Sequence, residues 1–186
     1  LDSPYARRAL EKPLGYAGDY EMMNQVYRNG YEGISLFGKL MHRYTVNEAA
    51  AIAVRQRRAY LSKKIRDVAV NSSSENTIKV CSVACGPAQE CVDYIHKLSN
   101  ETNKHVELTL IDQDIEALLE ARRNITTAIN TSGANVSVQC LPISVKDILK
   151  QSDKAREFLD QQFDLIYSAG LFEYLPQDIA TMLTHI

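Results

Sequence analysis

Strand and helix patterns alternate along residues 77–186, and this alternation constrains the fold more than any other feature of the chain. Short apolar, β-branched runs predict strands, and apolar residues spaced three and four positions apart predict the helices between them. The predicted strands are 78–83, 105–111, 135–140 and 163–168. The predicted helices begin at residue 87 or 88 and end at 98, and then cover 115–129, 153–161 and 177–186. Repeated strand–helix–strand units with right-handed crossovers form a doubly wound sheet. We therefore predict an α/β fold with a mostly parallel sheet.

The first 76 residues predict helices without strands. We expect one helix over 20–28, with Asp19 as its N-cap, and a long helix over 47–70. The long helix has one apolar stripe, formed by Val54, Leu61, Ile65 and Val68. A polar run, NSSSENT, follows it and indicates a loop. We therefore divide the chain into a helical segment, residues 1–76, and an α/β core, residues 77–186.

Composition and charge argue against several classes of protein. The net charge is −2, from 21 basic and 23 acidic residues, whereas nucleic-acid binders usually carry a basic excess. No apolar run approaches the roughly 18–20 residues that cross a bilayer, and the first residues lack the apolar core of a signal peptide. We expect a cytoplasmic protein with a small-molecule substrate, no nucleic-acid partner and no stable membrane insertion. A homo-oligomer is compatible with the sequence.

The cysteine pattern does not indicate a metal site. Zinc sites usually contain paired CxxC motifs or a CxxC with histidines, and the spacings here are CxxxC and then CxxxxxC. We expect four reduced, buried cysteines and no bound metal. The four residues are Cys81, Cys85, Cys91 and Cys140.

The first strand of the core ends in CGPAQE, which is unlike a phosphate-binding loop. Gly86 permits a close backbone approach, and Pro87 is expected in the first helical turn because it needs no N–H donor there. A dinucleotide site needs backbone donors here, and Glu90 near the helix N-terminus competes with an anion for the same positive end. We therefore expect a ligand without phosphate groups at this end of the sheet.

The second strand ends in LTLIDQD and offers a carboxylate for a sugar diol. Asp112 follows Gly86 by 26 positions, close to the ~20 expected of an acid that binds ribose hydroxyls. Either Asp112 or Asp114 could instead cap the next helix. We assign the cap to Asp114 and the ligand to Asp112.

These strand ends together resemble class I methyltransferases, which use S-adenosylmethionine. The segments are VCSVACGPAQE, LTLIDQD, the loop around Ser144, and FDLIYSAGLFEYL. Ser82 stands where many members carry an acid, and Ala88 where many carry a further glycine. The resemblance implies a Rossmann-like sheet with S-adenosylmethionine as cofactor. The residues we assign to cofactor binding are Ala84, Cys85, Gly86, Glu90, Asp112, Gln113, Ser144, Val145, Ser168 and Gly170.

A second resemblance covers the N-terminal segment. The runs KPLGYAGDYEMMNQVY, YEGISLFGKLMHRY and AAAIAVRQRRAYL are similar to bacterial proteins that make 3-hydroxypalmitic acid methyl ester, an extracellular signal. This implies O-methylation of a hydroxy fatty acid. Six apolar residues would then line a tunnel for its chain or simply pack the segment: Met22, Met23, Leu36, Phe37, Leu40 and Met41. A class I fold has seven strands and we count four, so we expect the chain to be C-terminally truncated.

Methyl transfer to a carboxylate needs alignment more than acid–base chemistry, because a carboxylate is already ionised at pH 7. An alcohol or amine would need a general base. The catalytic candidates are His42, Glu173 and Tyr16, and the substrate-binding candidates are Tyr20, Arg55, Arg58 and Tyr174. Two alternatives stay open: a non-catalytic module that senses S-adenosylmethionine or a lipid, and an NAD-type oxidoreductase, which CGPAQE disfavours.

Overall fold

The computed structural model describes residues 2–74, 76–97 and 99–185. The chain forms two compact units, Leu1–Tyr60 and Leu61–Ile186. The division falls inside a long helix, α4 (Ala49–Asn71), which matches the helix predicted over 47–70. The domain boundary expected after residue 76 stays a prediction.

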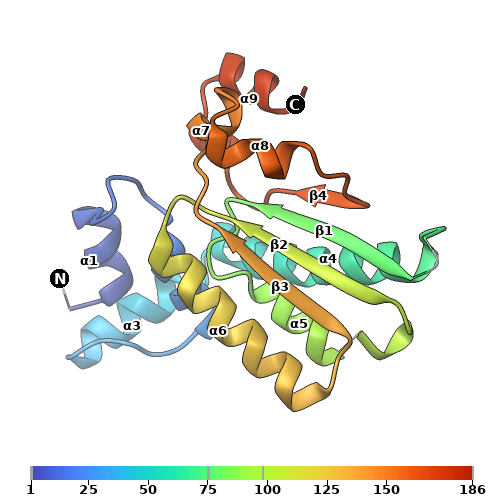
Figure 1. Ribbon diagram of the computed structural model, residues 1–186. Coiled ribbons are helices and arrows are strands. Elements are labelled where there is room, and N and C mark those ends of the chain that lie inside the picture. Colours follow the sequence, from blue (N-terminus) through green and yellow to red (C-terminus); the bar gives the residue numbers. More distant parts are fainter. Residues whose placement is uncertain (1, 75, 98, 186) are drawn as a thin grey trace. The chain divides into compact units, whose positions relative to one another are not determined.

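The second unit contains a parallel sheet of four strands (Figure 1). The strands are β1 (Thr77–Val83), β2 (His105–Ile111), β3 (Val136–Leu141) and β4 (Leu165–Tyr167). Their order is β3-β2-β1-β4, and every neighbouring pair is parallel. The chain therefore winds outward from β1 to β3 and then crosses back to β4, which confirms the α/β, Rossmann-like architecture. The direction of winding reverses between β1 and β4, where open α/β sheets bind ligands beyond the strand ends.

One face of this sheet carries the larger core. Helices α5 (Gln89–Lys97) and α6 (Ile115–Ser132), with the second half of α4, cover that face (Figure 1). Alternate strand residues point into it, as the two-residue period of a strand requires. The fully buried strand residues of this core are Ile78, Val80, Val106, Leu108 and Leu110.

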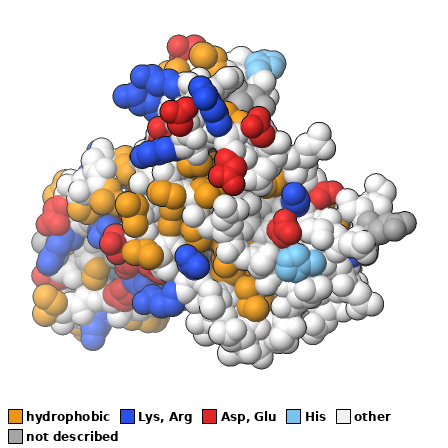
Figure 2. Space-filling model, in the orientation of Figure 1, with side chains coloured by type: hydrophobic (Ala, Val, Ile, Leu, Met, Phe, Trp, Pro, Cys, Tyr) orange, Lys and Arg blue, Asp and Glu red, His pale blue; other side chains and the backbone are white. Residues whose placement is uncertain are grey.

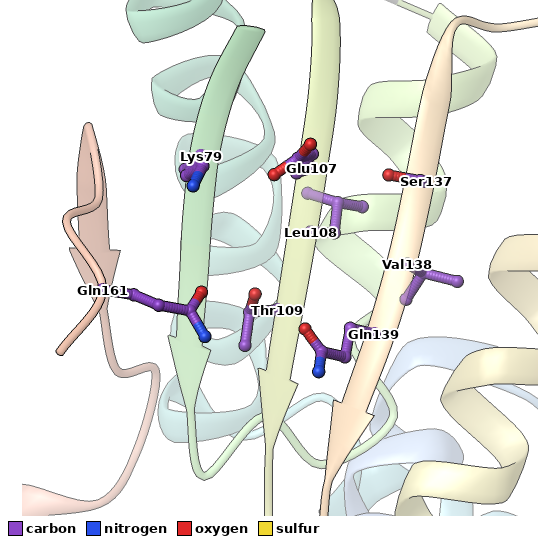
Figure 3. Close-up of a pocket in the computed structure, with 8 residues that line it drawn as sticks. All are labelled: Lys79, Glu107, Leu108, Thr109, Ser137, Val138, Gln139 and Gln161. Atoms are coloured by element: carbon purple, nitrogen blue, oxygen red, sulfur yellow. The ribbon is translucent and has the colours of Figure 1, made fainter. Parts of the chain in front are cut away.

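The opposite face is apolar only near the C-terminal ends of the strands. There, Cys81 and Ile111 pack beneath α7 (Val145–Leu149) and α8 (Asp153–Leu159), with Leu183 of α9 (Gln177–Leu183) at the edge of the cluster. Farther back along the strands the face is polar and surrounds a hollow of about 130 Å³ (Figure 3). The polar side chains that line it are Lys79, Glu107, Thr109, Ser137, Gln139 and Gln161. This hollow lies away from the carboxyl ends of the strands, so it is separate from the predicted ligand site.

Two local predictions in this unit are wrong. Pro87 lies in a turn before α5, which begins at Gln89, because Ala88 adopts a left-handed φ of 45° that ends any helical path through it. Helix α6 begins after its predicted cap, Asp114. The sequence also predicts one apolar face for this helix, of which Leu118 and Ile125 are buried and Ile129 packs against the core, but the other three residues do not. Its buried residues are Ala117, Leu118, Ala121, Ile125 and Ala128, whereas Ile115, Leu119 and Arg122 are exposed. Small alanines let the helix approach the sheet closely, and the larger apolar residues are left outside.

The first unit is helical, as predicted. It contains α1 (Pro4–Glu11), α2 (Tyr20–Arg28), α3 (Leu36–Thr45) and the beginning of α4. Asp19 caps α2 by accepting a hydrogen bond from the Met22 N–H, which confirms that prediction. The same carboxylate receives two hydrogen bonds of 2.8 Å from Arg8, which ties α1 to α2. Neither α1 nor α3 was predicted from the sequence.

The face of the molecule seen in Figure 2 has no strong charge bias. Acidic and basic side chains are interspersed on the visible face (Figure 2). Within the described residues, no helix combines the length and the apolar character that crossing a membrane demands. The same residues contain no group of three or more His, Cys, Asp or Glu that could hold a metal ion.

Candidate functional site

The loop after β1 has an unusual backbone. Three of its residues adopt positive φ angles, 53° at Ala84, 53° at Gly86 and 45° at Ala88. Glycine adopts this conformation freely, but each alanine costs about 1–2 kcal/mol there. Strain of this kind persists only where neighbouring structure enforces it, and it often marks ligand sites. The loop after β1 is therefore a candidate ligand site.

Hydrogen bonds to β2 hold this loop in place. The Cys85 N–H donates to the Ile111 carbonyl at 3.0 Å, and the Gly86 N–H donates to Asp112 Oδ2 at 2.8 Å. Within the loop, the Ala88 N–H donates to the Cys85 carbonyl at 3.1 Å. The predicted cofactor residues Ala84, Cys85, Gly86 and Asp112 are therefore brought together at one edge of the sheet.

Asp112 is the central acid of this group. Its side chain is only 9% exposed, and its second oxygen, Oδ1, accepts a hydrogen bond from the Asp114 N–H at 3.0 Å. Burial raises the pKa of Asp112, while the hydrogen bonds from the Asp114 and Gly86 backbones act in the opposite direction. The Gln113 backbone N–H also bonds to this carboxylate and lowers its pKa. The two oxygens together have four lone pairs, so the carboxylate keeps the capacity to accept a hydrogen bond from a ligand. Asp114 caps α6 through the N–H groups of Glu116 and Ala117, as predicted.

A second buried acid bonds to β4, the strand that flanks β1 on the side opposite to β2. Glu90, in the first turn of α5, is 3% exposed and accepts a hydrogen bond of 2.8 Å from the Tyr167 hydroxyl. The Cys91 sulfur lies 3.4 Å from the same hydroxyl. Burial, and after it the neighbouring Cys91 and Glu90, raises the pKa of Tyr167 well above its ordinary value, so the phenol keeps its proton. A carboxyl group therefore occupies the helix end at which a dinucleotide fold would bind phosphate.

Tyr167 was not assigned to the site from the sequence. It lies on β4 directly opposite Ser82 of β1. A tyrosine inside an otherwise aliphatic strand, LIY, is a signal that could have identified it, because a buried hydroxyl usually requires a partner.

The remaining strand-end candidates differ in their surroundings. Ser144 caps α7, with its hydroxyl 2.6 Å from Asp147 Oδ2, and Val145 is the first residue of that helix. The Ser168 hydroxyl, directly after β4, is buried and has no hydrogen-bond partner among the described residues. Gly170 follows in a bend, and Gln113 is exposed. Ser144 therefore has a structural task, whereas Ser168 offers an unused polar group.

His42 belongs to the first unit and lies on the buried face of α3. It is fully buried, and neither ring nitrogen has a hydrogen-bond partner among the described residues. Tyr5 packs edge-on against it at 6.4 Å, and Glu32 Oε1 lies 4.0 Å from its Nε2 atom. Burial is the main cause that lowers the pKa of His42, so the imidazole is neutral at pH 7.

The other candidates are spread over both units. Arg55 donates to the carbonyls of Val26 and Val46, so its guanidinium already joins two segments of the first unit, and Arg58 lies over the Tyr27 ring at 5.1 Å. Tyr16 and Tyr20 are half-buried in the same unit, whereas Glu173 and Tyr174 are exposed in the second. The roles assigned to these residues stay predictions.

Comparison with known proteins fits this geometry. A family model described as "Putative methyltransferase" matches residues 14–135, which include the strained loop and Asp112. A search of the curated proteins finds no match. The matched residues span well over half of the chain and carry the carboxylate, the loop and the first two strands of the site. The chain therefore belongs to this methyltransferase family.

Proposed function

We propose that this chain binds S-adenosylmethionine at the carboxyl ends of β1, β2 and β4 and uses it as the methyl donor. The observation that carries the proposal is the buried Asp112 carboxylate, fixed by the Gly86 N–H at the tip of a strained loop. A preorganised acceptor of this kind suits the two hydroxyls of a ribose. The family assignment supports a methyl donor as the ligand that carries this ribose.

The chemistry of the surrounding groups fits this cofactor better than a dinucleotide. Glu90 places a buried carboxyl group where a pyrophosphate would need donors, and the turn at Pro87 lacks one N–H. S-adenosylmethionine has no phosphate and supplies a methyl group on a cationic sulfonium. Asp112 would hold the ribose, the Ser168 hydroxyl would gain a partner, and the nearby acid is compatible with positive charge.

We further propose a carboxylate substrate, that of a 3-hydroxy fatty acid. The resemblance of the N-terminal segment supports this substrate, and a carboxylate needs no general base. His42 is buried and neutral, which is consistent with catalysis by alignment. Of the residues expected to line a tunnel, Met22 is buried, whereas Leu36, Phe37 and Leu40 are exposed. Their part in binding the acyl chain stays a prediction.

Calorimetry with the 186-residue chain tests the cofactor. S-adenosylhomocysteine should bind to the native chain and NAD should not. Asp112→Ala removes two hydrogen bonds to a carboxylate, each worth about 1.5–3 kcal/mol, so affinity should fall by roughly 100-fold or more. Asp114→Ala, which removes only a helix cap, is the matched control and should bind normally once folding is verified by circular dichroism. Unchanged affinity in a folded Asp112→Ala variant would overturn the ribose assignment.

A transfer assay tests the substrate. The chain is incubated with S-adenosylmethionine and 3-hydroxy acids of increasing length, and both S-adenosylhomocysteine and a base-labile ester are measured. Activity should rise along the series, because each buried methylene contributes roughly 0.8 kcal/mol. Cofactor binding without transfer to any acid would instead identify a sensing module.

A further inference from the structure

His105 forms hydrogen bonds with two polar side chains, one through each nitrogen of its ring. Its Nδ1 atom lies 2.9 Å from Asn135 Oδ1, and its Nε2 atom lies 2.9 Å from the Ser137 hydroxyl. A serine hydroxyl, an imidazole and a side-chain oxygen acceptor, linked in this order, are the parts of a nucleophile, a base and a group that orients the base. The three residues lie at the amino ends of β2 and β3, whereas Asp112 lies beyond the carboxyl end of β2.

The pairing of β2 with β3 brings these side chains together. Glu107 of β2 lies opposite Ser137 of β3 in the sheet. Because side chains alternate between the two faces of a strand, His105 shares the face of Glu107, and Asn135 shares the face of Ser137. The imidazole therefore reaches both residues of the neighbouring strand from one side of the sheet.

The amide of Asn135 determines which nitrogen of His105 carries the proton. The Asn135 Nδ2 group donates to the Asn103 carbonyl at 3.4 Å, so the amide oxygen is the atom that faces the imidazole. This oxygen can only accept, so in the neutral ring Nδ1 carries the proton and Nε2 keeps its lone pair. The Ser137 hydroxyl then donates to Nε2, which is the direction of proton transfer that a general base requires.

Ser137 also lines the polar hollow of about 130 Å³ on this face of the sheet (Figure 3). Lys79 and Gln139 line the same hollow and offer N–H donors to a ligand oxygen. Glu107 lies between Lys79 and Ser137 in the sheet register, so the hollow contains one positive and one negative side chain. These charges offset each other, and the small volume and mixed lining suit a small, uncharged polar molecule.

We propose that Ser137 and His105 form a second catalytic site, which hydrolyses small, uncharged carboxylic esters. Ser137 Oγ attacks the carbonyl carbon while His105 Nε2 takes its proton. The bond between that carbon and the alkoxy oxygen breaks, and Nε2 gives the proton to the departing alcohol. Water then attacks the acyl-serine, Nε2 takes one water proton and returns it to Ser137 Oγ, and the carboxylic acid leaves.

The neighbouring side chains assist without reacting. Asn135 is a positioning residue, because it holds the imidazole with Nε2 towards the serine. The N–H groups of Lys79 and Gln139 are the donors in the hollow for the negative oxygen of the tetrahedral intermediate. This inference is independent of the proposed methylation, because it uses the opposite end of the strands and needs no methyl donor.

Hydrolysis of 4-nitrophenyl acetate by the full 186-residue chain tests the proposal. The native chain should release nitrophenol in a burst, and acid-quenched protein should carry an acetyl group on the peptide that contains Ser137. Ser137→Ala should abolish the burst, and His105→Gln should slow acetylation of Ser137 about 100-fold. The matched control is His96→Gln, which removes an exposed histidine of α5 and should acetylate Ser137 at the native rate.

Variants of Asn135 separate positioning from a merely structural contact. Asn135→Ala should slow acetylation of Ser137 by at least about tenfold. Asn135→Asp should restore it, because a carboxylate also accepts from the Nδ1–H group. Asn135 and Ser137 are exposed, so their variants should keep the native circular dichroism spectrum. A fluorophosphonate, which loses fluoride when it bonds to an activated serine oxygen, should label Ser137 in the native chain and not in urea.

Two results would overturn the proposal. The first is acetylation of lysine or histidine side chains alone, with no acyl group on Ser137 of the native chain. The second is equal acetylation of Ser137 in the native, His105→Gln and Asn135→Ala proteins, which would identify the two hydrogen bonds as a cross-strand contact that only stabilises the sheet.

Discussion

Removing the hydroxyl group of Tyr167 should destabilise the protein far more than the same change at Tyr94. Both tyrosines belong to the core beneath the sheet face covered by α5 and α6. The Tyr167 hydroxyl donates to Glu90 at 2.8 Å, whereas the buried Tyr94 hydroxyl has no partner among the described residues. A buried acceptor that loses its donor costs about 1–3 kcal/mol, but deleting an unpaired buried hydroxyl relieves a desolvation cost.

Tyr167→Phe should therefore lower the free energy of unfolding by about 2 kcal/mol, or roughly 4–8 °C in Tm for a chain of this length. Tyr94→Phe should be neutral or slightly stabilising. Urea denaturation followed by circular dichroism measures both, and a double-mutant cycle with Glu90→Gln isolates the pair. In the cycle the two losses should be less than additive. Equal effects of the two phenylalanine variants, or strict additivity with Glu90→Gln, would refute the reasoning.

Three further predictions follow from burial and close packing. Burial lowers the folded-state pKa of His42, so the unfolded chain binds a proton more readily, and stability should fall as the pH drops through 6.5 towards the folded value. His42→Leu should flatten this decline in urea midpoints measured between pH 5 and 8; a parallel decline would contradict it. Gly38→Ala should cost about 1–3 kcal/mol in urea unfolding, because a Cβ there meets Asp2, whereas Gly30→Ala, with its nearest atoms 3.7 Å away, should cost much less. Burial raises the pKa of Cys81 to about 12, so this thiol should resist alkylation at pH 8 until the chain is unfolded, as peptide mass spectrometry can check; labelling in the native state would contradict its burial.

Much of the fold could be predicted because its elements have strong local patterns. Strand β2 has the predicted bounds, and α2 has both its predicted bounds and its predicted cap. Helices α1 and α3 were missed because glycines around and within them resemble loop signals, although Ser3 before Pro4 is a usual helix start. Gly38 is helical because tertiary packing leaves no room for a side chain, and a local pattern cannot show this.

The candidate site was less predictable, because its contacts join residues far apart in the sequence. Strand-end placement was sufficient to separate the cap, Asp114, from the acid that meets Gly86. The bond between Tyr167 and Glu90 links positions 77 residues apart, and no periodicity records it. For Ser144 the sequence did contain the needed signal. A serine followed three residues later by Asp147 is typical of a capping box, which is the contact that Ser144 makes in the structure.

Two buried acids, Asp112 and Glu90, hold the backbone at the carboxyl end of β1 in place. On one side Asp112 receives the Gly86 N–H, and on the other Glu90 receives the Tyr167 hydroxyl, so the strained loop is held between β2 and β4. Two alanines with left-handed φ angles cost about 2–4 kcal/mol together, and the hydrogen bonds to Ile111 and Asp112 offset part of that cost. A loop held in this way loses little conformational freedom when a ligand binds. For a reaction that depends on aligning a methyl donor with an acceptor, this rigidity is what the sheet end can contribute.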